Sequence, residues 1–375
     1  MNLLIPSEKV NEILEKLMNF YSKVPTIQDY FLERKREKVK DIDYEKFTVD
    51  FFNDNTIRPK DMDISVDLIN STIFNNSVQI ITSLPLESQI GRQMTIGVKE
   101  NNTNKYLGFI RLSSPVLTVK PRNEFFGQTV TPKMVNRYMI NGAVIVPVQP
   151  FGYNYLGGKL LALVCCSRDI INMFNKKYDM DLCFMETTSL YGDIKGVSQY
   201  DGLKPYIRYH GMTESKLFLF PNEDVYYEIR DYMRKLYGEE KWNGSLVDPK
   251  PSGPKMREYT KVIQILKFHL KEYNKDKLDE FNKFIENSMR SKTKKRYYYS
   301  MFGYDNVKEY VLSDGKIDLI KRENFDNYEL DNLIKWWKNK SQNRWEKLNE
   351  EGKIKNELEI YTTENIDTKN HNIIR

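Results

Sequence analysis

The residues best suited to catalysis follow the hydrophobic run DLCFM, at the end of an expected strand. Glu186 comes directly after this run, Thr187 and Ser189 come next, and Tyr200 and His210 follow a glycine-containing loop. A carboxylate in this place can act as a general base, and hydroxyls can bind a phosphate or a substrate. We therefore predict these five residues as catalytic candidates. The alternative is structural: the hydroxyls cap the next turn, Glu186 pairs with a Lys or Arg, and His210 belongs to the core.

A second set of candidates lies in the turn NYLGGK, which opens a hydrophobic helix. Glycine lets the backbone approach a ligand closely, and the free amides of a helix start attract phosphate. We predict that Asn154, Gly157, Gly158 and Lys159 hold a pyrophosphate-bearing cofactor. The turn matches neither a Walker A nor a dinucleotide motif, but it partly resembles the turn of the acyl-CoA-binding GNAT fold. An acyl-CoA or a related acyl donor is therefore the candidate cofactor. The alternative is that the glycines only allow a tight turn and close helix packing.

A third set lies in the run RSKTKKRYYY, which holds five cations, no acid and three tyrosines. The net charge of the whole chain is +6, so this run nearly equals it. Cations suit phosphates and aromatic rings suit base stacking. The sequence therefore predicts nucleic-acid contact here. The alternative is a solvated helix end followed by an ordinary aromatic strand. The predicted contacts are Arg290, Lys292, Lys294, Lys295, Arg296 and Tyr297.

Composition excludes several classes of protein. The chain has 375 residues, of which 40% are hydrophobic and 29% charged, so a sizeable core can form and whole-chain disorder is excluded. The three cysteines, Cys165, Cys166 and Cys183, lack CxxC spacing. A disulfide framework and a cysteine-based zinc site are therefore poor fits. The chain has only three histidines, too few for the ligands of a zinc hydrolase, and we expect no metal. No signal peptide or membrane span is evident, so we expect a cytoplasmic protein.

The elements that must position these candidates form a predicted α/β (α+β) core over residues 85–240. A hairpin begins at Gly91, and short helices and buried strands follow, including one long helix over 157–178 and a loop over 118–128. A helical N-terminal region (1–84) precedes the core. A Pro- and Gly-rich linker (241–255) and a helical, basic C-terminal region with a loose tail (256–375) follow it. The predicted architecture is a mixed sheet with helical extensions at both ends.

A series of short motifs runs through about 90–216 in a fixed order. These motifs are Gly91-Arg92, Leu107-Gly108 with Ser113, Arg122 to Gly127, Leu160-Leu161, Glu186-Thr187, Gly196, Tyr200 and Gly211-Met212-Thr213. In order and approximate spacing they resemble the core domain of the Druantia anti-phage protein A family, and more remotely Mom, a phage DNA-modification protein of GNAT-like fold. Two departures stand out: Asn123 where the family tends to have Asp, and Tyr209-His210 where it has Asn-Trp.

The resemblance implies a GNAT-like core and a role connected with DNA, in phage modification or in defence against phage. Arg92 and Arg122 then become candidate contacts for phosphate or cofactor, because the guanidinium fork binds phosphate through two hydrogen bonds. Their alternative is a structural salt bridge.

Two functions therefore stay open, beside a third possibility in which the protein is only a protein–protein scaffold. The first is a DNA-associated, acyltransferase-like enzyme that modifies DNA bases. The second is a non-catalytic nucleic-acid-binding component of a phage or defence system, which Asn123 and the incomplete turn favour. Both predict DNA as a partner, allow protein partners within such a system, and involve no membrane.

Overall fold

The computed structural model describes residues 5–86, 91–190, 196–243 and 254–366, with backbone alone at 215–217, 243, 254 and 290–293. The chain divides into two compact units. The first combines Met1–Glu37 with Ser215–Thr293, and the second combines Lys38–Glu214 with Lys294–Arg375. Most of the expected linker (241–255) lies outside the described residues.

The first unit is built from helices. Its elements are α1 (Ser7–Ser22), α2 (Ile27–Val39, whose last two residues belong to the second unit), α11 (Glu223–Tyr237), α12 (Glu239–Asn243), α13 (Pro254–Tyr273) and α14 (Lys275–Ser288). Apolar residues of α1 recur every three or four positions, so Val10, Ile13, Leu17 and Tyr21 are all buried on one side of the helix. Rings from several elements meet in the same interior: Tyr226 and Tyr259 each contact Phe220 edge to face, which gives this unit its own aromatic core.

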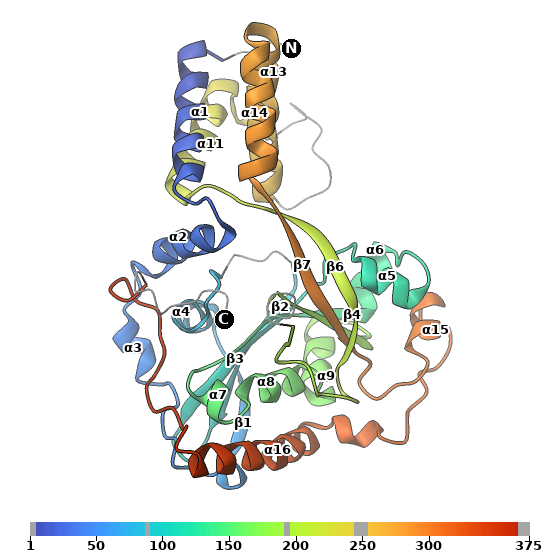
Figure 1. Cartoon of the computed structure of the whole chain (residues 1–375). Coiled ribbons are helices and arrows are strands. Elements are labelled where there is room, and N and C mark those ends of the chain that lie inside the picture. Colours follow the sequence, from blue (N-terminus) through green and yellow to red (C-terminus); the bar gives the residue numbers. More distant parts are fainter. Residues whose placement is uncertain (1–4, 87–90, 191–195, 244–253, 367–375) are drawn as a thin grey trace. The chain divides into compact units, whose positions relative to one another are not determined.

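The second unit contains the predicted mixed sheet, which has seven strands in the order β1-β2-β3-β4-β5-β7-β6 (Figure 1). The strands are β1 (Ile64–Leu68), β2 (Gln93–Glu100), β3 (Lys105–Ser113), β4 (Met139–Pro147), β5 (Phe184–Ser189), β6 (Arg208–Phe218) and β7 (Arg290–Ser300). Strands β1 to β4 pair antiparallel, β4 pairs with β5 in parallel, and β5 pairs with β7 antiparallel. The prediction of a mixed α/β protein is confirmed.

Helices pack on both faces of this sheet. One face is covered by α7 (Phe151–Asn154), α8 (Gly157–Cys165), α9 (Arg168–Tyr178) and α16 (Leu330–Glu350), whose apolar residues join one large core with the strands. The other face is covered by α3 (Tyr44–Thr48), α4 (Ser71–Ile81), α5 (Lys120–Phe126), α6 (Pro132–Tyr138) and α15 (Val307–Leu312). The 3-10 turns η1 (Pro59–Asp61) and η2 (Phe325–Tyr328) complete the unit.

Three local expectations need correction or completion. The single helix expected over 157–178 is two helices, because Ser167 caps the start of α9 by accepting a hydrogen bond from the Asp169 amide. The loop expected over 118–128 contains α5, which has Pro121 in its first turn and ends at Gly127 with φ of 74°. The basic run belongs to β7 rather than to a helix end, since α14 stops at Ser288.

None of the helices in the described segments has the length together with the apolar composition that crossing a bilayer requires. Cys165, Cys166 and Cys183 are free and buried.

Candidate functional site

Glu186 lies at the centre of a buried charged cluster. Its Oε1 pairs with Nη1 of Arg122 at 3.0 Å, and its Oε2 accepts a hydrogen bond from the Tyr297 hydroxyl at 2.7 Å. The other guanidinium nitrogen of Arg122, Nη2, donates to the carbonyls of Val116 and Leu117 at 2.9 and 2.6 Å. The side chain of Arg122 is fully buried, and that of Glu186 is 5% exposed. The cluster therefore ties α5, β5 and β7 together.

The protonation of Glu186 is set by two opposing effects. Burial raises the pKa of this carboxyl, whereas the charge of Arg122 and the hydrogen bond from Tyr297 lower it, and the net direction is upward. Burial, together with the neighbouring Glu186 charge, also holds the pKa of Tyr297 far above its ordinary value, so Tyr297 remains a hydrogen-bond donor. Glu186 thus pairs with an arginine, as the structural alternative predicted. Its buried surroundings and raised pKa are also typical of functional carboxyls.

The other catalytic candidates do not gather around Glu186. Alternation along β5 directs Thr187 and Ser189 to the opposite face of the sheet, where the Thr187 hydroxyl donates to the carbonyl of Gly142 at 2.8 Å. Tyr200 packs against Tyr298 on that face, and burial raises the pKa of Tyr200 to about 12.

His210 lies on the Glu186 face. Its half-buried ring meets Phe125 and Tyr299 at centroid distances of 5.6 and 5.8 Å. The five candidates are therefore divided between the two faces of the sheet.

The turn before α8 is filled by the chain itself. A Cβ at Gly157 would lie 2.5 Å from the ring of Phe151, and a Cβ at Gly158 would lie 2.2 Å from the side-chain oxygen of Gln199. Close packing explains both glycines, and the start of α8 is covered by Gln199.

Asn154 and Lys159 also bond within the protein. The Asn154 side-chain amide donates to Asn55 Oδ1 at 2.9 Å and to the Lys355 carbonyl at 2.7 Å, and its oxygen accepts from the Lys355 amide at 3.1 Å. The ammonium of Lys159 donates to the backbone carbonyls of Gln199 and Asp201. The side chains of Asn154 and Lys159 thus have protein partners.

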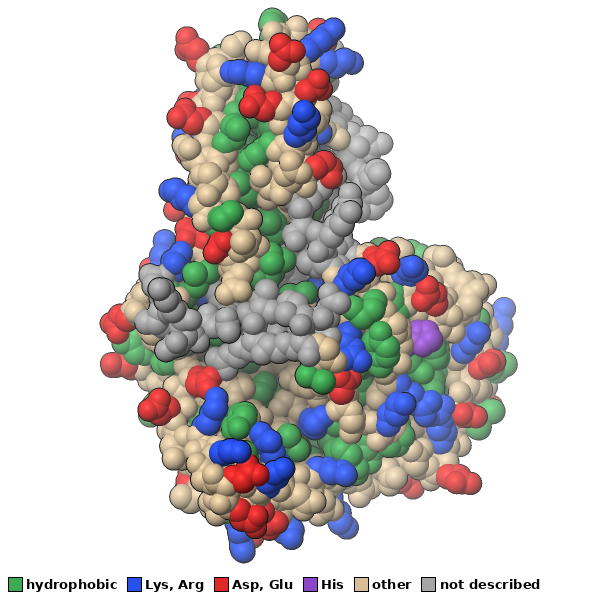
Figure 2. Space-filling model, viewed as in Figure 1, with side chains coloured by type: hydrophobic (Ala, Val, Ile, Leu, Met, Phe, Trp, Pro, Cys, Tyr) green, Lys and Arg blue, Asp and Glu red, His purple; other side chains and the backbone are tan. Residues whose placement is uncertain are grey.

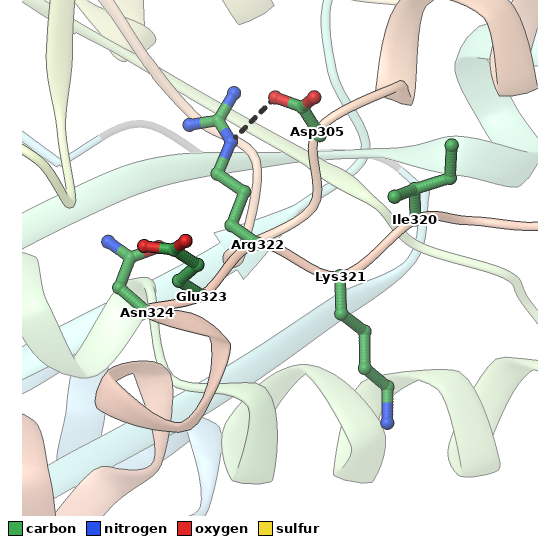
Figure 3. A pocket seen from close by; sticks show the side chains of 6 residues that line it. All are labelled: Asp305, Ile320, Lys321, Arg322, Glu323 and Asn324. Atoms are coloured by element: carbon green, nitrogen blue, oxygen red, sulfur yellow. Dashed lines mark hydrogen bonds and ion pairs between the residues drawn. The ribbon is translucent and has the colours of Figure 1, made fainter.

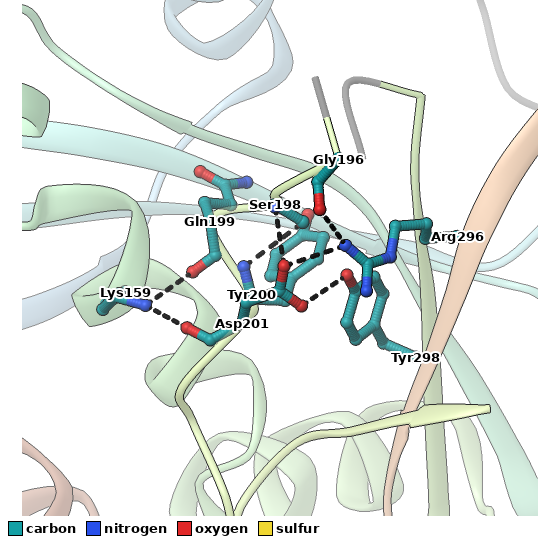
Figure 4. Close-up of polar contacts among 8 residues, drawn as sticks. All are labelled: Lys159, Gly196, Ser198, Gln199, Tyr200, Asp201, Arg296 and Tyr298. Atoms are coloured by element: carbon teal, nitrogen blue, oxygen red, sulfur yellow. Dashed lines mark hydrogen bonds and ion pairs between the residues drawn. The ribbon is translucent and has the colours of Figure 1, made fainter. Parts of the chain in front are cut away.

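Asp201 is the hub of a second polar network, on the face that carries Thr187 and Tyr200 (Figure 4). Its Oδ2 accepts hydrogen bonds from Arg296 Nη1 at 3.0 Å and from the Ser198 amide at 2.9 Å. Its Oδ1 accepts one from the Tyr298 hydroxyl at 2.8 Å. Arg296 Nη1 also donates to the carbonyl of Gly196 at 2.8 Å. The loop over 196–201 is thereby fastened to β7.

Alternation along β7 separates the predicted basic run. Lys294 is exposed, whereas Lys295 is half-buried and burial lowers its pKa. Tyr297 is fully buried and presents no face for stacking. The side chains of Arg290 and Lys292 lie outside the described residues. Lys295 and Tyr297 therefore lie on the opposite face of β7 from Lys294 and Arg296.

An exposed aromatic ring lies beside β7, that of Tyr209 on β6, which the sequence did not lead us to select. Tyr209 is 44% exposed, and the guanidinium of Arg296 lies 4.6 Å from the centre of its ring. The sequence feature that could have revealed Tyr209 is the pair Tyr209-His210, which replaces the Asn-Trp of the family. Neighbouring side chains of a strand point to opposite faces, so Tyr209 faces away from His210.

The two predicted arginines have structural partners. Arg92 Nη2 donates to the backbone carbonyl of Asn136 at 2.6 Å, and Arg122 belongs to the Glu186 cluster.

Two shallow depressions contain none of the predicted site residues. The larger, of about 440 Å³, is lined by Asp305, Ile320, Lys321, Arg322, Glu323 and Asn324 (Figure 3). Arg322 Nε is paired there with Asp305 at 3.0 Å, so the charges are mixed. The second, of about 170 Å³, is lined by Lys133, Arg137, Tyr138, Asp181, Tyr310, Asp314 and Gly315. Within the described segments, His, Cys, Asp and Glu form no group of three that could hold a metal ion.

Comparison with known proteins gave two matches. The family model described as Druantia protein DruA matches residues 22–241. A curated protein, Druantia protein DruA of Escherichia coli (strain UMEA 4076-1), is 25% identical over 168 residues, which cover 41% of this chain and 41% of that protein. No solved structure matches. The segment matched by the family model includes Glu186, Asp201 and Tyr209 but neither β7 nor α16.

Proposed function

Because this chain belongs to the Druantia protein DruA family, we propose that it serves in anti-phage defence as a nucleic-acid-binding component. Its contact surface is the β6–β7 strip, which consists of Tyr209, Lys294 and Arg296. The observation that carries this proposal is the exposed ring of Tyr209 with the guanidinium of Arg296 against it. An exposed aromatic ring beside cations is the arrangement by which proteins stack on bases and hold phosphates.

The strip is also preorganised. Asp201, Gly196 and Tyr298 fix the position of Arg296, so little side-chain freedom is lost when a ligand binds. Lys294, on the same face of β7 by alternation, is exposed. Figure 2 shows Lys and Arg side chains, with Asp and Glu among them, next to hydrophobic ones on the face of the sheet-containing unit that is in view.

We further propose that the core is GNAT-like. Strand β4 leads through a turn into α8, and β5 returns beside β4 in parallel. The two strands pair only from Met139 to Asn141, opposite Phe184 to Glu186, so β4 continues without β5 beside it. Splayed parallel strands followed by a glycine turn are what the resemblance to the GNAT fold leads us to expect.

The test of nucleic-acid binding is the affinity of labelled single- and double-stranded DNA, measured by fluorescence anisotropy over a range of salt concentrations. Base–ring stacking contributes about 1–3 kcal/mol per base, so Tyr209→Leu should weaken binding about 5- to 150-fold. Its matched control is Tyr227→Leu, since Tyr227 is 41% exposed and Arg230 lies 4.5 Å from its ring centre. Absence of salt-sensitive binding by the unaltered protein, or equal losses in both variants, would refute the proposal.

A second candidate function is base modification by acyl transfer. One observation favours it: Glu186 is a buried carboxyl whose pKa is raised. In that reaction a base amine would attack the donor thioester, the C–S bond would break as an amide forms, and the amine proton would pass to a carboxylate such as Glu186. The close packing around Gly157 and Gly158 speaks against a donor there.

The two candidates differ in what they leave on DNA. Mass spectrometry of nucleosides from the source DNA, with and without this gene, should show no difference if the protein only binds. A modified nucleoside that depends on the gene, together with acyl-CoA binding by calorimetry, would favour the transferase.

A further inference from the structure

Helix α16 presents a second cationic surface. Between Lys335 and Arg344 its sequence, KWWKNKSQNR, holds four cations and no acid. We name Lys335, Lys338, Lys340 and Arg344 the α16 cations. Among the described residues, the structure gives them no ion pair, whereas Lys347 and Lys353 pair with Glu351 just beyond. A run of unpaired cations on one helix favours a polyanionic partner.

The helix is firmly held to the second unit. Trp337 is fully buried and its indole N–H donates to the carbonyl of Tyr155 at 2.9 Å, where the hydroxyl of Ser341 also donates at 2.7 Å. In Figure 1 the helix lies along α8 at the border of the unit, so one side packs and the other faces solvent. The anchor fixes which residues point outward.

Helical spacing divides the outward residues between two flanks and a centre. At the 100° per residue of an α-helix, Lys335 and Lys338 lie on one flank of the exposed side and Lys340 lies on the other. Arg344, seven residues after the buried Trp337, lies at the border of the packed side. The exposed Asn339 lies between the two flanks, and so does Asn343. The structure gives these two asparagines no hydrogen-bond partner among the residues that it describes.

Aromatic rings steady two of the α16 cations. The ammonium of Lys340 lies 5.8 Å from the ring centre of Trp336, and the guanidinium of Arg344 lies 4.8 Å from that of Tyr153. Cations held over rings lose less freedom on binding than free ones.

We propose that α16 binds double-stranded nucleic acid, with its cations on the phosphates and Asn339 and Asn343 toward base edges. This inference rests on the proposed function, and it adds a second contact outside the β6–β7 strip and beyond the matched segment 22–241. Charge complementarity selects the partner, because cations on both flanks of the exposed side match two phosphate backbones, and asparagine can bond to adenine with two hydrogen bonds. The exposed centre of the helix is polar rather than apolar, which disfavours a lipid surface.

The experiment compares the salt dependence of duplex DNA binding in variants of the full chain. The α16 variant is Lys335→Gln, Lys338→Gln and Lys340→Gln, which keeps Arg344 on Tyr153. Its control carries Lys347→Gln, Lys353→Gln and Lys355→Gln, equal in charge but drawn from lysines that pair with Glu351 or Glu359. Each lost phosphate contact reduces the slope of log K against log salt by about 0.9, so the α16 variant should lose about 2.7 and the control less than about 1.

A second variant, Asn339→Ala with Asn343→Ala, should keep the slope and reduce discrimination among duplex sequences on the order of tenfold. Equal slopes for the α16 variant and the unaltered protein would overturn this inference. If Tyr209→Leu still weakens DNA binding in that case, the proposed function of the β6–β7 strip stands. If the unaltered protein binds anionic vesicles or acidic proteins but no DNA, both fail.

Discussion

The two faces of strand β7 carry similar side chains in different surroundings. On one face the hydroxyl of Tyr297 donates to Glu186, whose charge is matched by the fully buried Arg122. On the other face the hydroxyl of Tyr298 donates to Asp201, whose side chain remains 33% exposed beside Arg296. Each face thus has a tyrosine, a carboxylate and an arginine, and burial makes the difference. The buried set holds the sheet and α5 together, whereas the open set presents a cation and a ring to a partner.

The comparison is tested most strongly by removing the buried negative charge. Glu186→Gln leaves the Arg122 charge in the interior without a counter-charge, and should cost about 3–5 kcal/mol of unfolding free energy in urea titrations. Asp201→Asn is the matched change on the open face and should cost about 1–2 kcal/mol, since water can reach the network. An equal or larger loss for Asp201→Asn would show that burial does not separate the two faces.

A smaller effect is expected from the two tyrosine hydroxyls. Tyr297→Phe removes a hydrogen bond to a buried carboxylate and should lower the unfolding free energy by about 1.5–3 kcal/mol. Tyr298→Phe removes the bond to Asp201 and should cost about 1 kcal/mol, because Asp201 keeps its bonds from Arg296 and Ser198. Urea titrations of the two variants measure both losses. A larger loss for Tyr298→Phe than for Tyr297→Phe would contradict the proposed difference between the two faces.

The smallest expected effect is a dependence on pH. Burial lowers the pKa of Lys295 below its ordinary value of 10.5, so the folded protein binds fewer protons than the unfolded chain between the two values. Stability should therefore rise as the pH increases toward 10.5. Lys295→Met should remove this rise in Tm as the pH approaches 10.5, whereas Lys294→Met, which alters the exposed neighbour, should keep it. Identical pH profiles for the two variants would count against a buried Lys295.

The sequence predicted elements better than it predicted neighbours. Hydrophobic patterning was enough for the hairpin, for β5 and for the helix of which α8 is the first part, because such patterns are local. The contacts that define the two faces join residues 64, 111 and 95 positions apart: Arg122 with Glu186, Glu186 with Tyr297, and Asp201 with Arg296. Such pairings depend on strand order and register, which no local pattern specifies. Asp201 was missed for that reason, since its loop has no distinctive composition.

The glycine turn before α8 is a second place where the sequence did not predict the contacting residues. The glycines indicated a place of close approach, but the sequence did not show whether a ligand or the chain itself approaches there. In the structure the neighbours are Phe151 and Gln199 of the chain itself.

The contact between Gly158 and Gln199 has a consequence for how this chain can vary through evolution. Any side chain at position 158 would displace Gln199, and Gln199 belongs to the loop whose Asp201 steadies Arg296. The interior turn and this loop are therefore linked through one side chain. A lineage that replaces Gly158 must move or shorten the side chain of residue 199, so the two positions should covary.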